Sequence, residues 1–276
     1  SLFSHILVAG VPVFATGFWE DIFKSVSSFR RLLAAIISSI LFIYLSGNYF
    51  TSVDIYLLDV VFSALYLFPI LTIIAVAALS NAINIIDGFN GLASGSVFLM
   101  TLAIAYLSHQ NGDILVMQIA LLFAASVVGF FVVNFPRGSL FLGDAGAYLN
   151  GYILGVLAIL LVERNEQITP LVLLVIFAYP IIELLFSIYR KTLRKGHRPD
   201  QPDKVHFHML VYRRYGRKWS RTTLYQNSLT GLLMLSFSAL ALLYVLFLPV
   251  TRASALLYFF IILFVYLYVY KRMSLN

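Results

Sequence analysis

The chain has 276 residues, of which 61% are hydrophobic and only 11% are charged. Soluble globular domains carry about 25% charged residues, so this chain has too few polar groups to cover a surface in water. The absence of cysteine excludes disulfides, thiolate metal ligands and cysteine nucleophiles. A net charge of +7 would suit a nucleic acid or an anionic lipid surface, but its distribution along the chain favours another explanation.

Nine apolar stretches are long enough to cross a bilayer, which takes about 20 residues. In chain order we predict spans at 2–18, 32–48, 60–80, 95–109, 114–133, 147–163, 168–188, 228–248 and 252–270. The first stretch has no basic region before it and no evident cleavage site, which disfavours a signal peptide. The predicted fold class is an all-α, polytopic transmembrane helical bundle that forms one integral-membrane domain over residues 1–276.

The basic residues predict the orientation of this bundle. If the loop after the first span is cytoplasmic, that side also holds the C-terminal tail, and its loops are 19–31, 81–94, 134–146 and 189–227. All of the 19 Lys and Arg residues except Arg164 and Arg252 then lie on this side, as the positive-inside rule requires. The net charge is therefore mainly a topological signal, and we expect a membrane but no nucleic acid as a partner.

The loop after the first span carries Glu20 and Asp21, followed by Arg30 and Arg31. Adjacent carboxylates near cations can accept a proton, bind a metal or lie beside phosphates. The alternative is an interfacial anchor, because Trp19 precedes this solvated charge cluster. On these residues alone both interpretations stay open.

In the second loop, Asn81, Asn84 and Asp87 follow one another at intervals of three residues. This spacing places them on one side of a helix if the preceding span continues that far. Amide and carboxylate oxygens on one face suit Mg²⁺ or a metal bound to phosphate. Gly88 and Gly91 let the backbone turn and come close to a ligand. A simple turn between spans explains the glycines but not the polar residues at helical spacing, so we favour a functional loop.

In the third loop, Asp144 lies among small residues just before a span. A carboxylate in such surroundings has an open face toward a metal or a phosphate. It could also cap the N-terminus of the following helix, which is a common role for Asp and does not exclude metal binding.

The fourth loop is the longest polar stretch, and it holds His206 and His208 two residues apart. In an extended conformation both side chains would point the same way. Because Mg²⁺ prefers oxygen ligands, contact with phosphate or sugar hydroxyls, or proton transfer, is favoured over metal binding. A basic loop that serves topology explains Arg190 to Lys195 but not the histidine run.

A transporter or lipid flippase is the alternative class of function. That class predicts ionisable groups midway through the spans. Only Glu183 is such a candidate, and a charge partner such as the nearby Arg190 would explain it equally well. Other acids, among them Asp87 and Asp144, lie in the predicted cytoplasmic loops, which favours an enzyme.

Three of these loops together resemble a known family. The run from Asn81 to Gly95, the Phe-Leu-Gly-Asp run that ends at Asp144 and the His-Phe-His run occur in that order between spans. They resemble the polyprenyl-phosphate N-acetylhexosamine-1-phosphate transferases of glycosyltransferase family 4, relatives of phospho-N-acetylmuramoyl-pentapeptide transferase. The resemblance covers essentially the whole chain. It implies transfer of an N-acetylhexosamine-1-phosphate from a UDP-sugar to undecaprenyl or another polyprenyl phosphate, with release of UMP, to start a lipid-linked cell-surface glycan.

The resemblance also implies roles for single residues. Asp144 and Asn84 match positions at the metal, expected to be Mg²⁺ with Mn²⁺ as the alternative. Asp21, Glu20 and Asp87 match acids near the reacting phosphates. The expected substrate-binding residues include an aromatic that stacks on uracil, nucleoside contacts and groups at the sugar diphosphate; they are Arg30, Asn81, Asn90, Asn134, Phe141, Arg198, His206 and His208.

Some positions depart from the family pattern. Glu20 replaces an aspartate, Asn90 replaces an aspartate of many bacterial members, and the His-Phe-His run replaces three consecutive histidines of the pentapeptide transferase. The last difference argues against that particular enzyme. Members usually begin with about two more spans, so we expect further N-terminal spans in the natural protein. A bacterial inner membrane is the expected location, and a homodimer is an expected assembly.

Overall fold

A computed structural model describes residues 1–193, 205–220 and 222–274, apart from the side chains of Leu193 and Trp219. The described residues form helices joined by loops. In chain order the elements are α1 (Leu2–Phe23), α2 (Ser28–Ser46), α3 (Tyr56–Ala64), α4 (Phe68–Ile86), α5 (Leu92–Gln110), α6 (Ile114–Asn134), α7 (Gly143–Arg164), α8 (Val172–Ile176), α9 (Ala178–Leu193), α10 (Phe207–Val211), the π-helical turn η1 (Tyr212–Gly216), α11 (Arg217–Trp219), α12 (Thr223–Phe247) and α13 (Arg252–Ser274).

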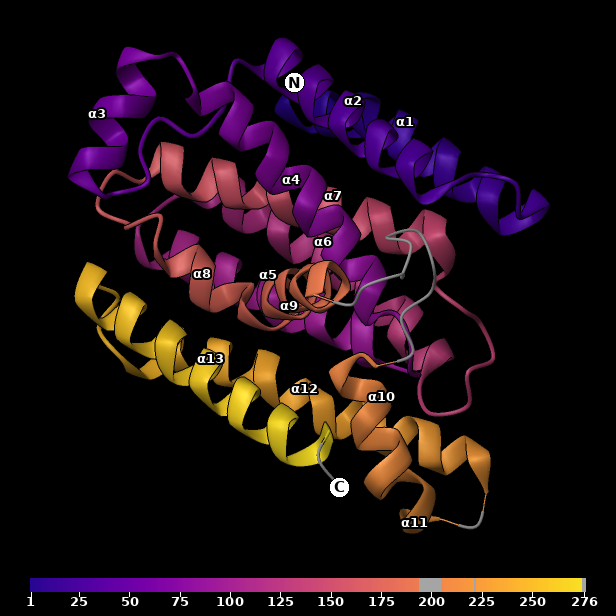
Figure 1. The fold of residues 1–276 in the computed structure, drawn as a ribbon. Coiled ribbons are helices and arrows are strands. Elements are labelled where there is room, and N and C mark those ends of the chain that lie inside the picture. Colours follow the sequence, from indigo (N-terminus) through magenta and orange to yellow (C-terminus); the bar gives the residue numbers. More distant parts are fainter. Residues whose placement is uncertain (194–204, 221, 275–276) are drawn as a thin grey trace.

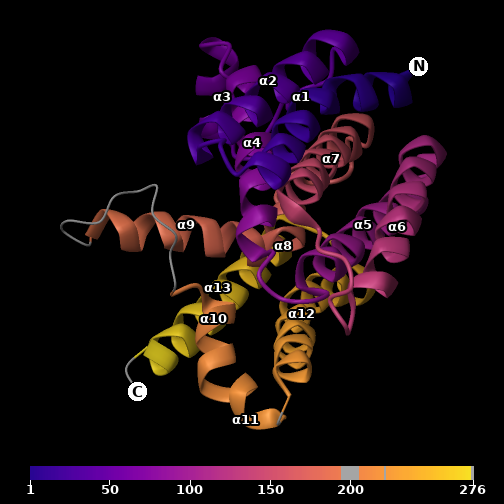
Figure 2. The same cartoon turned by 90° about the vertical axis from the view of Figure 1, so that its right-hand side faces the viewer.

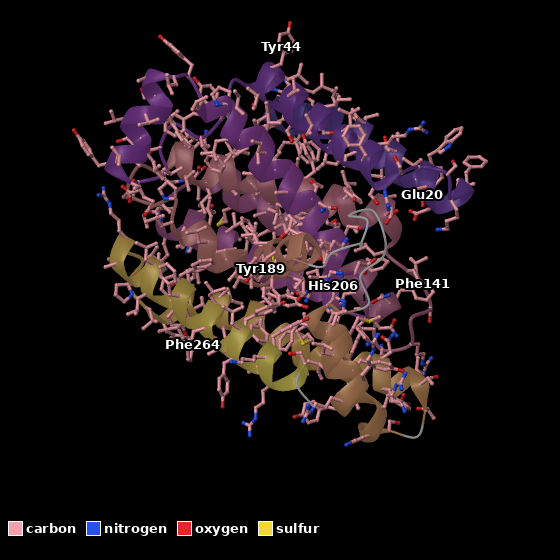
Figure 3. The ribbon with its side chains drawn as sticks, viewed as in Figure 1. Glu20, Tyr44, Phe141, Tyr189, His206 and Phe264 are labelled. Atoms are coloured by element: carbon pink, nitrogen blue, oxygen red, sulfur yellow. The ribbon has the colours of Figure 1, made fainter. Side chains whose placement is uncertain are left out.

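Within the described residues, eight helices are long and apolar enough to cross a membrane; they are α1, α2, α4, α5, α6, α7, α12 and α13. Large apolar side chains such as Leu122 and Phe247 are exposed. Phe264 likewise lies on the outside of the bundle (Figure 3). Water would disfavour so large an exposed apolar surface, whereas lipid tails cover it without cost. The predicted all-α, polytopic bundle is confirmed, and the chain is a multi-pass membrane protein.

The predicted span 168–188 is not one continuous helix. The stretch is divided into α8 and α9, with Phe177 between them. Pro180 explains the break, because proline has no N–H to donate to the carbonyl of Ile176 and its ring would clash with that carbonyl. Beyond the break, α9 leaves the bundle sideways (Figure 2).

The predicted span 60–80 begins too early. Its first residues belong to the short helix α3, and α4 begins only at Phe68, after Tyr66 at a φ of 54°. Pro69 favours a helix start here, because an N–H in the first turn has no partner within the helix anyway. The true span continues to Ile86 and therefore carries Asn81 and Asn84 near its C-terminus.

Helix α7 lies at the centre of the bundle, in contact with α1, α2, α4, α5 and α6 (Figure 1). Helices α12 and α13 lie on the opposite side from α1 and α2. A Cβ built on Gly151 of α7 would lie 2.4 Å from Cα of Ser80 in α4, so only glycine permits this approach. The close contact fixes the polar C-terminal turn of α4 against the first turns of α7.

The ends of α1, α4 and α6 and the beginnings of α2, α5 and α7 meet at one end of the bundle, on the right in Figure 1. We call it the site end, because the candidate site lies there. Helix α3 and the loop between α7 and α8 lie at the opposite end (Figure 1).

Candidate functional site

Asp144 is the second residue of α7, and side chains from two other helices reach its carboxylate. Nδ2 of Asn84 in α4 donates a hydrogen bond to Oδ1 at 2.7 Å. The guanidinium of Arg31 in α2 forms an ion pair with Oδ2. The side chain of Asp144 is 19% exposed, so the group is partly open to a ligand. The site end thus holds a carboxylate at which α2, α4 and α7 meet.

Asp21 of α1 binds the first turn of α7. Its carboxylate accepts hydrogen bonds from the backbone N–H of Asp144 at 2.9 Å and of Ala145 at 3.0 Å. Gly17 permits this approach, because a Cβ there would lie 2.6 Å from the α7 backbone at Ala145. The alternative that Asp144 itself caps α7 is wrong, since the helix has Leu142 at its N-cap and no side-chain cap. Asp21 supplies the acceptor instead, which leaves the Asp144 carboxylate for other partners.

The polar residues at the end of α4 lie on one side, as their spacing predicts. Oδ1 of Asn81 accepts a hydrogen bond from the Tyr148 hydroxyl at 3.0 Å, one turn along α7 from Asp144. Asn84 follows at Asp144, and Asp87 is the C-cap residue. Burial, together with the negative charges of Asp144 and Asp21, raises the pKa of Asp87 to about 7. Three carboxylates therefore lie close enough to influence one another at this end.

These side chains fit a divalent cation that prefers oxygen. Among the described residues, no group of three or more His, Cys, Asp or Glu side chains forms a preformed metal cage. Mg²⁺ does not need one, because it keeps several waters and binds through one or two carboxylates together with substrate phosphates. Asp144 and Asn84 offer such oxygens, and a cation would offset the cost of ionising Asp87, whose pKa is raised by burial and by the charges of Asp144 and Asp21.

The turn after α4 is held by internal hydrogen bonds. Oδ1 of Asn134 accepts from the N–H of Gly91 at 2.6 Å, and its Nδ2 donates to the carbonyl of Leu140 at 2.7 Å. Nδ2 of Asn90 donates to the carbonyl of Pro136 at 3.0 Å. Both asparagines are buried, so in this structure they join the second loop to the third.

Helix α12 supports the same turn. Oδ1 of Asn227 accepts a hydrogen bond from the N–H of Asn90 at 2.7 Å, and the Ser228 hydroxyl donates to the carbonyl of Pro136. The backbone of Asn90 is thus held by a residue about 137 positions further along the chain.

Other predicted residues lie nearer the surface. Phe141 is 77% exposed in the third loop, where its ring is accessible to a ligand (Figure 3). Glu20 accepts a hydrogen bond from the N–H of Val26 at 2.7 Å, which stabilises the turn between α1 and α2. Arg30 is exposed, whereas the adjacent Arg31 faces Asp144. Arg198 lies outside the described residues.

The two predicted histidines occupy different environments. His206 is the N-cap residue of α10 and has an extended backbone, whereas His208 is in the first turn of that helix, so the stretch is extended only at its start. Their rings nevertheless stack, with centroids 5.5 Å apart. His208 is only 2% exposed, and burial lowers its pKa to about 4. The His206 side chain is 14% exposed, and its Nδ1 lies 2.8 Å from Oε1 of Glu183.

Sequence reasoning missed four residues that build this site. The sequence did not distinguish Arg31 from Arg30, because packing determines which of the two arginines of α2 faces Asp144. Tyr148 carried a signal, since it follows Asp144 by four residues and such pairs share a helix face. Asn227 and Ser228 gave none, because their partners are distant in sequence.

The chain is similar to known proteins of one family. The model of glycosyl transferase family 4 matches residues 3–162. A Bacillus subtilis protein named "Probable undecaprenyl-phosphate N-acetylglucosaminyl 1-phosphate transferase" is 34% identical over 140 residues, which cover 50% of this chain and 38% of the relative. A decaprenyl-phosphate N-acetylglucosaminephosphotransferase of Mycolicibacterium smegmatis is 31% identical over 159 residues, 50% of this chain and 39% of the relative.

A longer match is found in Thermotoga maritima. Its undecaprenyl-phosphate alpha-N-acetylglucosaminyl 1-phosphate transferase is 28% identical over 228 residues, which cover 83% of this chain and 65% of the relative. In all three cases the match covers less than two thirds of the relative's own length. Because the family model matches more than half of its 276 residues, the chain belongs to glycosyl transferase family 4.

Proposed function

We propose that the protein transfers N-acetylhexosamine-1-phosphate from a UDP-sugar to a polyprenyl phosphate such as undecaprenyl phosphate, and releases UMP. The names of the relatives state transfer of N-acetylglucosamine 1-phosphate, or N-acetylglucosamine phosphate, to undecaprenyl or decaprenyl phosphate, which supports this class of reaction. The observation that carries the proposal is structural: the carboxylates of Asp21, Asp87 and Asp144 gather at the site end, where the guanidinium of Arg31 pairs with Asp144.

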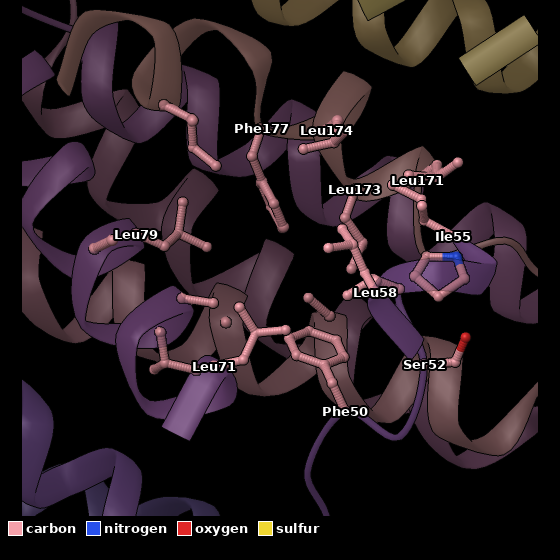
Figure 4. A pocket seen from close by; sticks show the side chains of 18 of the residues that line it. Phe50, Ser52, Ile55, Leu58, Leu71, Leu79, Leu171, Leu173, Leu174 and Phe177 are labelled. Atoms are coloured by element: carbon pink, nitrogen blue, oxygen red, sulfur yellow. The ribbon is translucent and has the colours of Figure 1, made fainter. Parts of the chain in front are cut away.

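An apolar cavity on the side of the bundle supports a lipid acceptor. It has a volume of about 410 Å³ and extends from α3, at the end opposite the site end, along α4, α7, α8 and α9, with apolar side chains such as Leu79, Leu173 and Phe177 on its walls (Figure 4). Such a lining suits an isoprenoid tail and offers nothing to a nucleotide.

A second cavity lies between this apolar space and the site end. It has a volume of about 230 Å³ and lies between α4 and α9, where Asn81 and Lys191 contribute polar atoms. Leu184 lines both cavities, so they are neighbours at this residue. Because Asn81 also bonds Tyr148 one turn from Asp144, a lipid that filled both cavities would place its phosphate near the carboxylate cluster.

In phosphoryl transfer the protein mainly positions the reactants and neutralises the negative charge of the phosphates. An oxygen of the lipid phosphate attacks the β-phosphorus of the UDP-sugar, and the bond from that phosphorus to the bridging oxygen breaks, so that UMP leaves with the electron pair. The attacking oxygen is already an anion at neutral pH, which removes the need for a strong base. Arg31 is placed to stabilise negative charge on the phosphoryl oxygens once it is released from Asp144.

We include Mg²⁺, with Mn²⁺ as the alternative, in this proposal. When bound, the ion neutralises charge on the diphosphate. Asp144 and Asn84 are the residues that would hold it. Asp21 fixes the first turn of α7 and thereby the direction of the Asp144 side chain.

A transporter or flippase is not favoured. The ionisable residue that could have lined a transport path, Glu183, is fully buried and bonded to His206 and Phe207. We propose a bacterial inner membrane with the site end toward the cytoplasm, where UDP-sugars are available. The expected homodimer can be tested by light scattering of the purified protein.

One assay tests the function. Membranes that contain the protein are supplied with Mg²⁺, undecaprenyl phosphate and labelled UDP-N-acetylhexosamines, and both UMP release and label in the lipid phase are followed. We expect both to appear together and to be lost in Asp144→Asn at normal expression. If the folded protein released UMP from none of the UDP-sugars, the proposal would be wrong.

A further inference from the structure

Glu183 of α9 is a buried carboxylate that the proposed reaction does not use. Its exposed fraction is 0%. Its oxygens accept hydrogen bonds from the backbone N–H of Phe207 at 3.1 and 3.3 Å and from the Tyr266 hydroxyl at 2.8 Å. Oε1 also lies 2.8 Å from Nδ1 of His206. Burial of a carboxylate is costly unless it is hydrogen-bonded, so this set of partners indicates a specific role.

The segment that carries His206 is held at a second point as well. Nη1 of Arg190 donates a hydrogen bond to the carbonyl of Val205 at 2.8 Å, and the Tyr270 hydroxyl donates to the same carbonyl at 3.0 Å. Helices α9 and α13 therefore fix the backbone on both sides of His206. This arrangement depends on the break after α8, which directs α9 sideways toward the segment.

The contacts of Glu183 decide which nitrogen of His206 carries the proton. The N–H of Phe207 and the hydroxyl of Tyr266 are donors, so both oxygens of an ionised Glu183 act as acceptors. Nδ1 of His206 must then be protonated and donate to Oε1. Within the described residues, no group bonds to Nε2 of His206, so Nε2 is the ring nitrogen that a ligand can reach.

His208 cannot share this role. Its Nδ1 lies 3.3 Å from the Tyr179 hydroxyl, and a Cβ built on Gly88 would lie 3.1 Å from its Nε2. The ring is buried against the turn that follows α4. His208 thus supports the turn that carries Asp87, while His206 remains partly exposed.

We propose that Glu183 is the positioning residue of His206: it fixes the protonated Nδ1 and the ring orientation so that Nε2 meets the sugar diphosphate of the donor. The identity of the ligand rests on the proposed function, whereas the tautomer does not. Carboxylates orient metal-bound imidazoles in this way, and their loss there costs about 10- to 100-fold, which sets the size of effect expected here.

Glu183→Gln tests the proposal with little change in shape. The amide oxygen can still accept from Phe207 and Tyr266, so the amide nitrogen turns toward Nδ1 of His206. Nδ1 must then become the acceptor, and the proton moves to Nε2. We expect a fall in kcat/KM on the order of 10- to 100-fold. Tyr266→Phe is the matched control, because it removes a hydrogen bond from the same carboxylate but leaves the bond to His206; it should keep near wild-type activity.

A double-mutant cycle shows whether Glu183 acts through His206. If it does, Glu183→Gln added to His206→Ala should cause no further loss. Additive losses in the double variant, or full activity of folded Glu183→Gln, would overturn the proposal.

The tautomer can be measured without any assay of activity. The chain has five histidines, so ¹⁵N-histidine spectra are simple, and the signals of His206 are assigned by their absence in His206→Ala. We expect protonated Nδ1 in the wild type and protonated Nε2 in Glu183→Gln. A wild-type proton on Nε2 would contradict the inference even if transfer activity were present, and the expected tautomer would support it even if the sugar transfer assay failed.

Discussion

At the scale of single residues, we predict different effects on transfer activity for substitutions of the neighbouring residues Arg31 and Arg30. Arg31 pairs with Asp144, whereas Arg30 is exposed at the start of α2. We expect Arg31→Ala to lower kcat on the order of 100-fold, because a cation at the reacting phosphates would be lost. Arg30→Ala should cause a clearly smaller loss, because an exposed side chain away from Asp144 can contribute to substrate binding only. Assays of sugar-phosphate transfer in matched membranes check this, and equal losses in the two variants would contradict it.

The raised pKa of Asp87 predicts that the stability of the folded protein depends on pH when divalent ions are absent. Its pKa in the folded protein is about 7, above its ordinary value of 3.8. A raised folded pKa means that the folded state favours the protonated form, so stability is lost as pH rises from about 4 through 7. Asp87→Asn removes this loss. Its melting temperature should therefore exceed that of the wild type more at pH 8 than at pH 5, measured with a chelator present; a constant difference would argue against the charge cluster.

The site could be predicted from sequence only in part, for reasons that individual residues make clear. Asn81 and Asn84 were placed correctly, because helical spacing is a local property. The partner of Glu183 was not found, since Arg190 is close in sequence but His206 and Tyr266 become its neighbours only when α9 turns sideways. Packing also determines that His208 is buried while His206 is partly exposed, so the sequence did not distinguish the two.

At the scale of helices, we predict that alanine has different effects on stability at two glycines, each of which lies within an apolar membrane-spanning helix. Gly151 of α7 lies against Ser80 of α4, whereas nothing lies within 4 Å of a Cβ built on Gly129 of α6. Gly151→Ala should destabilise the protein by about 1–3 kcal/mol, because the two helices must move apart. Gly129→Ala should be neutral or stabilise by up to about 1 kcal/mol, since alanine favours a helix.

Thermal unfolding of the two variants in detergent checks this, with transfer activity as a second readout. Because the contact of α4 with α7 brings Asn84 to Asp144, Gly151→Ala should also reduce activity in protein that still folds. A Gly151→Ala variant as stable and active as Gly129→Ala would show that the close approach is not needed.

The sequence predicted the ends of helices correctly where an uninterrupted apolar run forms the helix. The prediction was wrong where a proline starts or breaks a helix. The spans from 114–133 and 252–270 agree closely with α6 and α13, because a run of apolar residues in a membrane has no alternative to a helix. The start of α4 and the break before α9 follow from Pro69 and Pro180. Apolar runs alone do not distinguish a straight span from a broken one, since lipid and protein cover both equally well.

At the scale of the whole molecule, the positive charges predict that the site end faces the cytoplasm. In the predicted topology all Lys and Arg residues except Arg164 and Arg252 fall on the cytoplasmic side, and the structure places these two at the end opposite the site end. The chain has no cysteine, so single cysteines report orientation without a background. Ser139, in the loop before α7, and Gln167, in the loop after it, are both exposed and lie at opposite ends of the bundle.

A membrane-impermeant maleimide applied to intact spheroplasts should therefore label Gln167→Cys but not Ser139→Cys. After the membrane is opened, both should react, which shows that Ser139→Cys is accessible and folded. The orientation matters for the function, because a UDP-sugar made in the cytoplasm reaches the cluster around Asp144 only from that side. Labelling of Ser139→Cys in intact spheroplasts would place the cluster outside and would contradict the use of a cytoplasmic sugar donor.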